Sequence, residues 1–288
     1  MPAKKIKIAI AYDFDGTLAP GTMQEQSFLP VVSVDKDRFW EETKAHAKEN
    51  DMDEILAYME LMLKKSKEAK KRSTREAFKE YGKSIAYFPG VEAWFDRIDA
   101  HAVGLGCTVD HFIISSGNKE TIEGTRIAKK FKHIWASCFK YDVHGVAEWP
   151  ALAVNYTGKA QYLFRINKGI FNSWDNDKIN EFVEERDRPY PFKNMLYLGD
   201  GITDVPAMKM VTYQGGKSIV VYESRKHGAK AKAHKLVEHH RADIAVPADY
   251  TENSKLDRAV KAAIGQIAAR HKFEQLDTST LKGRRPPK

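Results

Sequence analysis

The 288-residue chain is poor in cysteine and lacks any apolar run long enough to cross a bilayer. Its two cysteines, Cys107 and Cys138, exclude a disulfide-based scaffold. The apolar run at residues 6–12 still contains Lys7, and because there is no long apolar segment and no small-residue cleavage site, we expect no signal peptide. Hydrophobic residues make up 42% of the chain, which excludes disorder as a whole. We therefore expect a soluble, cytoplasmic protein with no membrane partner, and nothing in the sequence specifies its oligomeric state.

Acidic side chains are too few to balance the basic ones, and the formal net charge is +8. The excess lies in residues 224–241, with six basic to one acidic side chain, and in residues 271–288, with five to two. Residues 1–223 carry 32 of each sign. A solvated helix face is the commoner meaning of such segments, and nucleic-acid binding is the less favoured alternative. We therefore expect the net charge to influence solubility rather than function.

Short apolar segments alternate with helical ones, which favours an α/β fold with a Rossmann-like parallel sheet. Strands are expected at residues 6–12, 111–114, 194–198, 218–222 and 243–246, and two of the expected helices lie at about 119–131 and at 177–185. A helical stretch of roughly 70 residues after the first strand is too long for a βα connection. The sequence therefore predicts a catalytic core of residues 1–19 and 89–270, a helical cap inserted at 20–88, and a disordered basic tail at 271–288.

Three of the expected strands end in polar motifs: DFDGT at 13–17, SSG at 115–117 and GDGITD at 199–204. In an open α/β sheet, ligands bind beyond the carboxyl ends of the strands, so these motifs are expected to meet at one crevice. Four carboxylates would lie there, those of Asp13, Asp15, Asp200 and Asp204. Crowded carboxylates repel one another, and a hard cation with oxygen ligands relieves that repulsion. Mg²⁺ is the expected ion.

The first motif has two aspartates separated by one residue, followed by a glycine that permits a sharp turn. This arrangement lets one carboxylate attack a substrate while the other acts on the leaving group. Carboxylate nucleophiles that form aspartyl-phosphates are an established covalent strategy.

The four features together resemble the haloacid dehalogenase superfamily of phosphohydrolases: DFDGT after an apolar strand, a strand ending in Ser115, a later lysine, and GDGITD after another apolar strand. The helical insertion and the extended segment 134–148 are similar to its phosphoserine-phosphatase-like branch. The resemblance covers about residues 6–222. It implies a Mg²⁺-dependent phosphatase that acts on a small phosphorylated metabolite.

The resemblance also implies roles for the four aspartates. Asp13 would be the nucleophile, and Asp15 would be the general acid for the leaving group and then the base for the hydrolytic water. Mg²⁺ would be bound by the Asp13 carboxylate, the Asp15 backbone carbonyl and Asp200. Asp204 would lie in or next to the coordination shell.

Phosphate binding is assigned by the same resemblance to the second motif and a lysine. Ser115 and the backbone amides near Ser116 and Gly117 would hold phosphate oxygens. Lys159 matches the family's placement of the lysine best, because it stands at a predicted helix start. Lys168 is the alternative, since the separation from Lys159 to the fourth motif is longer than the family pattern.

The segment after the first motif departs from the phosphoserine-phosphatase-like pattern. Thr22 stands where that branch usually has an acidic residue, and Glu25 follows a little later. Phosphoserine is therefore not the expected substrate, and Asp15 disfavours dehalogenation. A phosphotransferase or mutase would keep the same motifs and stays open. The more distant alternative is a nucleic-acid-binding protein that uses residues 224–241 and 271–288.

Overall fold

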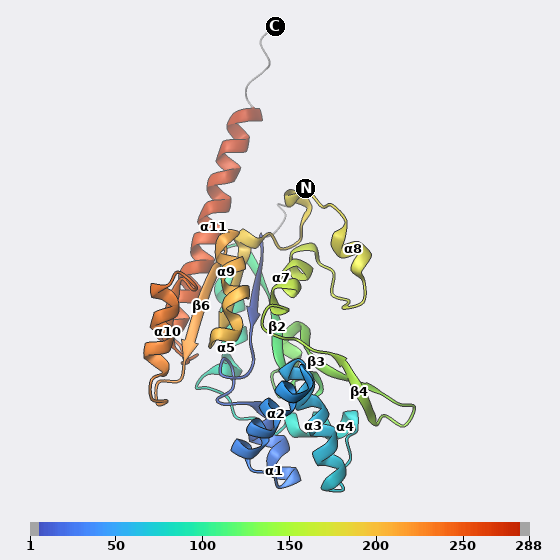
Figure 1. Ribbon diagram of the computed structural model, residues 1–288. Coiled ribbons are helices and arrows are strands. Elements are labelled where there is room, and N and C mark those ends of the chain that lie inside the picture. The colour runs from blue at the N-terminus through green and yellow to red at the C-terminus, as the bar shows by residue number, and fades with distance from the viewer. Residues whose placement is uncertain (1–5, 283–288) are drawn as a thin grey trace.

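The computed structural model describes residues 6–282, apart from the side chains of residues 202 and 277–282. Its centre is a seven-stranded sheet in the order β4-β3-β2-β1-β5-β6-β7 (Figure 1). The strands are β1 (Ile6–Tyr12), β2 (Cys107–Asn118), β3 (Phe131–Tyr141), β4 (Ala147–Leu152), β5 (Met195–Gly199), β6 (Lys217–Tyr222) and β7 (Ile244–Pro247). Every neighbouring pair is parallel except β3–β4, an antiparallel hairpin at the edge. The predicted Rossmann-like α/β fold is therefore confirmed.

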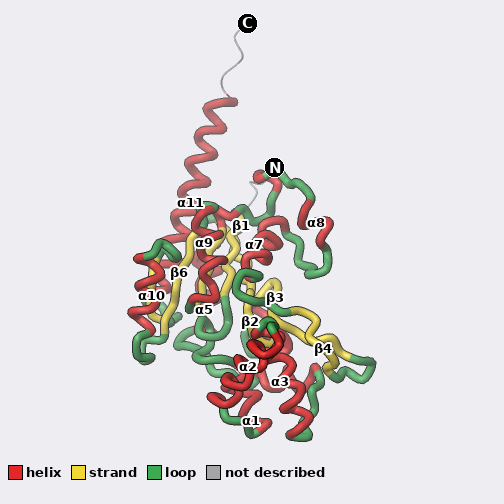
Figure 2. The backbone as a smooth tube through the Cα atoms, viewed as in Figure 1, coloured by secondary structure: helices red, strands yellow, loops and turns green. Residues whose placement is uncertain are grey.

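Helices cover both faces of this sheet (Figure 2). One face packs against α5 (Val91–Gly104) and α11 (Lys255–Lys282), and the other against α7 (Lys159–Lys168), α9 (Val205–Tyr213) and α10 (Ala229–Glu238). The central strand β1 is apolar at almost every position because it is buried on both faces. Among the described residues, no helix combines the length and apolar character needed to cross a bilayer.

A group of helices lies beyond the carboxyl ends of the parallel strands (Figure 1). It consists of the π-helical turn Gln24–Phe28 and of α1 (Leu29–Val32), α2 (Lys36–Asn50), α3 (Glu54–Glu68) and α4 (Arg75–Gly82). The three longer helices start at residues whose side chains accept hydrogen bonds from the first turn: Asp35, Asp53 and Thr74. The group has its own apolar core, which includes Phe139 of β3. The β3–β4 hairpin therefore packs with these helices although it lies outside residues 20–88 in the chain. The division into a cap of residues 20–88 and a core of residues 1–19 and 89–270 remains a prediction.

The carboxyl-terminal region differs from the expected disordered tail at 271–288, since α11 continues to Lys282. The helix is held to the body by Arg270, which donates to the carbonyl of Lys193 at 2.8 Å and to Asn194 Oδ1 at 2.7 Å. One turn later Glu274 pairs with Lys193 at 3.3 Å. These contacts extend the helix past residue 271, and the remainder of the predicted tail, residues 283–288, lies outside the described residues.

Two expected helices are shorter than the sequence suggested. The helix predicted at about 119–131 ends at Glu123 as α6 (Lys119–Glu123) and is followed by the 3₁₀ turn Ala128–Lys130. The helix predicted at 177–185 is reduced to α8 (Asn176–Asn180).

Two glycines let α4 and α6 touch backbone to backbone. A Cβ atom added to Gly124 would lie 1.8 Å from the carbonyl oxygen of Lys79, and one added to Gly82 would lie 2.1 Å from that of Thr121. Side chains larger than hydrogen cannot fit at either position without moving a helix. The contact joins the helical group to the sheet and coincides with the early end of α6.

We expect Gly124→Ala to lower the free energy of unfolding by about 1–3 kcal/mol, because the added methyl group forces two backbones apart. Gly104→Ala is the matched control, since nothing lies within 4 Å of a Cβ at that position. There the substitution should raise stability by up to about 1 kcal/mol through helix propensity. Urea denaturation measures both, and equal effects of the two substitutions would contradict the close contact.

Candidate active site

The three polar motifs meet at the carboxyl edge of the sheet, as the sequence predicts. The amide of Asp13, after β1, donates to the carbonyl of Leu198 in β5 at 2.9 Å. Gly16 has φ +71°, and a Cβ there would lie 2.2 Å from Asp200 Oδ2. A Cβ on Gly117 would lie 3.0 Å from Asp15 Oδ2. The glycines in the first two motifs therefore allow three distant segments to approach closely.

The ammonium group of Lys159 joins two carboxylates at the centre of this edge. Its Nζ lies 2.7 Å from Asp13 Oδ2 and 2.7 Å from Asp204 Oδ1. Lys159 and Asp204 are fully buried. Burial alone would lower the pKa of Lys159, but the two carboxylates outweigh this effect and raise it. Lys159 is therefore a fixed positive charge beside Asp13.

Asp204 supports the surrounding residues through both of its oxygens. Oδ1 accepts from Lys159 and from the hydroxyl of Tyr197 at 2.8 Å. Oδ2 accepts from the amides of Asp200 at 3.1 Å and Gly201 at 3.4 Å. Asp204 thus holds the turn that carries Asp200, and its own oxygens already have hydrogen-bond donors.

Asp13, Asp200 and Asp204 form the cluster that could hold a metal ion among the described residues, with one oxygen from each within 4.8 Å of the others. Although Asp200 is exposed at the crevice, its pKa is raised to about 8, first by partial desolvation of the carboxyl group and then by the nearby charges of Asp204 and Asp13. Burial followed by the charge of Asp13 also raises the pKa of Asp15. Lys159 does not fully offset the burial and the mutual repulsion of these carboxyl groups, and the oxygen-only donor set fits a hard divalent cation.

The second motif lies at an irregularity in the sheet. The register between β2 and β3 shifts between Ser115 and Asn118, which leaves Ser116 and Gly117 outside the regular ladder. Ser115 Oγ accepts from the amide of Gly117 at 3.1 Å and keeps its own proton available for donation. The Ser116 hydroxyl is buried without a partner. The sequence analysis assigned Ser116 only a backbone role, so this hydroxyl is an additional candidate for phosphate contact.

The alternative lysine, Lys168, lies away from these groups. It is at the opposite end of α7 from Lys159, about 13 Å along the helix axis. Its ammonium group donates to the carbonyls of Ile179 at 2.6 Å and Glu181 at 2.5 Å. Lys168 thus holds the segment around α8 against α7, and the longer separation between lysine and fourth motif comes from that added segment.

The motifs open into a crevice of about 730 Å³ that also borders the helical group. Its lining includes Glu25, Trp40, Tyr58 and Tyr156. The indole of Trp40 donates to Glu25 at 2.8 Å and packs edge to face with Tyr58 at 6.1 Å. Phe39 is buried in the core of the helical group, whereas its neighbour Trp40 packs against that core and also lines the crevice. No sequence signal distinguished the two neighbours.

The helical group is connected to Lys159 by a chain of hydrogen bonds. Asp53 accepts from the amide of Ile55 through one oxygen and from Asn155 Nδ2 at 2.8 Å through the other. Asn155 Oδ1 in turn accepts from the amide of Gly158 at 2.9 Å, immediately before Lys159. The first turn of α3 therefore helps to place the lysine.

Tyr197 was not singled out in the sequence, although it is the polar side chain in an otherwise apolar strand. We expect Tyr197→Phe to lower the free energy of unfolding by about 1–3 kcal/mol, because the buried Asp204 carboxylate loses a donor. Tyr213→Phe, at a position that is 82% exposed, is the control and should have little effect. Thermal and urea denaturation measure the difference; an unchanged Tyr197→Phe protein would contradict the role of this hydrogen bond.

Comparison with known proteins agrees with this arrangement. The family model of haloacid dehalogenase-like hydrolases matches residues 10–209. An uncharacterised protein of Borreliella burgdorferi is 30% identical over 276 residues, which cover 86% of this chain and 93% of the relative. A substrate-bound phosphoserine phosphatase structure has a TM-score of 0.54 at 16% identity, covering 90% of this chain and 99% of its own. A HAD family hydrolase from Salmonella enterica serovar Typhi has a TM-score of 0.54 at 13% identity, with coverages of 85% and 68%. The two structures share the fold, and the sequence matches show that the chain belongs to the haloacid dehalogenase-like hydrolases.

Proposed function

We propose that the protein is a Mg²⁺-dependent phosphomonoesterase that acts on a small phosphorylated metabolite through an aspartyl-phosphate on Asp13. The observation that carries this proposal is how the Asp13 carboxylate is held at the crevice. One oxygen accepts from the amide of Phe14 at 2.7 Å, and the other lies 2.7 Å from Lys159. A carboxylate oriented in this way, with a positive charge beside it, suits attack on a phosphorus atom.

In the first step, an Asp13 oxygen forms a bond to phosphorus while the bond to the ester oxygen breaks. The leaving oxygen takes a proton from Asp15, whose pKa is raised by burial and by the charge of Asp13, a shift that favours the protonated form that a general acid needs. In the second step, the Asp15 carboxylate accepts a proton from water as that water attacks phosphorus. The bond from phosphorus to Asp13 breaks, inorganic phosphate leaves, and both aspartates return to their starting states.

The remaining motif residues bind and orient the phosphate group. Lys159 compensates charge near Asp13, and Ser115 and Ser116 offer hydroxyl groups to phosphate oxygens. The Asp13 and Asp200 carboxylates and the Asp15 carbonyl would hold Mg²⁺, with Asp204 orienting Asp200 from behind. Mg²⁺, when bound, supplies charge stabilisation for the phosphate oxygens.

The Asp13→Asn substitution tests the nucleophile. With p-nitrophenyl phosphate and Mg²⁺, we expect kcat/KM to fall by at least roughly three orders of magnitude, since the amide cannot form the covalent intermediate. Asp96→Asn, on α5 with a 72% exposed side chain, is the matched control and should retain activity. Undiminished turnover by Asp13→Asn would contradict the proposal. Nitrophenol release that exceeds phosphate release once an acceptor alcohol is added would instead identify a phosphotransferase, because the phosphoryl group then goes to the alcohol and not to water.

Metal binding is tested without relying on activity. At Mg²⁺ tenfold above its dissociation constant, we expect stabilisation by about 1.4 kcal/mol, measured as an increase in Tm. Asp200→Asn should abolish this increase and raise the Tm of the metal-free protein, because it removes one of the repelling carboxylates. Asp96→Asn should respond to Mg²⁺ like the unsubstituted protein. A full Mg²⁺ response in Asp200→Asn would show that this residue is not a ligand.

A further inference from the structure

The basic segment 224–241 begins at the edge of the sheet where the motifs lie. β6 is parallel to β5, so its last residue, Tyr222, lies at the same edge as Asp200. The chain then turns into α10, one side of which borders the crevice through Lys232 and Lys235. A spacing of three residues places these two side chains on one helix face.

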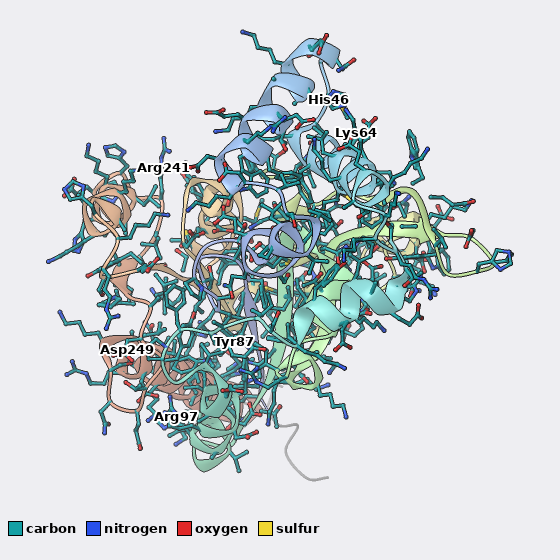
Figure 3. All side chains as sticks on the ribbon, turned by 90° about the horizontal axis from the view of Figure 1, so that it is seen from below. His46, Lys64, Tyr87, Arg97, Arg241 and Asp249 are labelled. Carbon is teal, nitrogen blue, oxygen red and sulfur yellow. The ribbon has the colours of Figure 1, made fainter. Side chains whose placement is uncertain are left out.

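Lys226 and Arg241 border the crevice from either end of this helix. Together with Lys232 and Lys235 they form what we call the basic wall. Viewed from the side of the helical group, Figure 3 shows Arg241 between α10 and the helices that carry His46 and Lys64. The sequence predicted that the charge of residues 224–241 influences solubility rather than function. Four of these side chains nevertheless border the crevice that contains the polar motifs.

The positive charges of the basic wall have no counter-ions within the described part of the protein. None of its four side chains lies within 4.0 Å of a carboxylate oxygen in residues 6–276, although many surface lysines elsewhere are paired, such as Lys65 with Glu42 and Lys130 with Asp96. Lys226 borders the same crevice as Asp200. Four uncompensated cations thus share one crevice with the phosphate-binding motifs.

The part of the crevice lined by the helical group carries aromatic side chains. Trp40 and Tyr156 line it, and Tyr156 is 46% exposed. A volume of about 730 Å³ exceeds what one phosphate on a three-carbon metabolite fills and is in the range of larger organic ligands. The crevice therefore has room for a substrate body between the aromatic side and the basic wall.

We infer that the substrate is a phosphomonoester with a second phosphate group on a larger organic body, and that the basic wall binds this second phosphate. The inference rests on the proposed function and extends it to the substrate class. One phosphate lies at Asp13 and Lys159, and the other makes charge-assisted hydrogen bonds to the lysines of α10. The organic body lies against the aromatic side.

Matched substrate pairs test this inference: adenosine 3′,5′-bisphosphate against AMP, and fructose 1,6-bisphosphate against fructose 6-phosphate. We expect kcat/KM to be at least about tenfold higher for at least one bisphosphate, the factor that one charge-assisted hydrogen bond provides. In Lys232→Gln/Lys235→Gln, this preference should fall about tenfold. High salt should reduce it in the unsubstituted protein.

The matched control is Arg225→Gln/Lys230→Gln, which removes the same charge from side chains that border a neighbouring hollow and not the crevice. This control should keep the preference for the bisphosphate. If both double variants lose the preference for the bisphosphate to the same extent, the preference depends on net charge and not on the basic wall, and the inference is overturned. A higher kcat/KM for a 5′-phosphorylated oligonucleotide than for either bisphosphate would also overturn it, in favour of nucleic acid.

The outcomes separate this inference from the proposed function. Equal turnover of mono- and bisphosphates, abolished by Asp13→Asn, would overturn the inference and leave the phosphatase proposal intact. If no ester is hydrolysed, calorimetry still measures binding of adenosine 3′,5′-bisphosphate and AMP. Binding of the bisphosphate that is about tenfold tighter, and is lost in Lys232→Gln/Lys235→Gln alone, would support the basic wall. Equal binding would overturn it.

Discussion

The buried ion pairs of Lys159 are the interaction on which the reaction centre depends. A buried ammonium group is tolerated only when opposite charges compensate it, and Lys159 has two carboxylates at 2.7 Å. Those contacts fix the end of β1 and the start of α7 and α9 relative to one another. Asp204 also accepts hydrogen bonds from the backbone amides of Asp200 and Gly201, and these bonds fix the turn that carries Asp200. The position of each acidic group is thus set by partners from other segments.

The helical group is tied to the same centre by direct contacts. The hydroxyl of Tyr58 donates to the carbonyl of Ser116 at 2.5 Å, and Asp53 reaches the turn before Lys159 through Asn155. The backbone contact between α4 and α6 anchors the other end of the group. The helical group and the polar motifs therefore share one connected framework, and both line the crevice.

The strand pattern and the polar motifs could be predicted because they are local in sequence. An apolar strand followed by DFDGT or GDGITD specifies both the strand and the carboxylates at its end. The contribution of Tyr197 was not predictable, because a tyrosine in a buried strand is usually part of the core and its partner lies seven residues away around a turn. Trp40 and Phe39 were likewise indistinguishable until the orientation of α2 was known. The end of α6 depended on a contact with a helix about 40 residues earlier in the chain.

The sequence by itself determined the α/β class, the four aspartates and the family resemblance, because each follows from residue types at short spacing. It also located the excess positive charge in residues 224–241 but assigned that charge to solvent, since those residues follow every motif along the chain. Only the tertiary structure placed β6 beside β5 and showed that the segment after β6 borders the crevice. A count of charges along the sequence does not say which residues lie close together in space. The strand order of the sheet does, because it places segments that are far apart in the chain side by side.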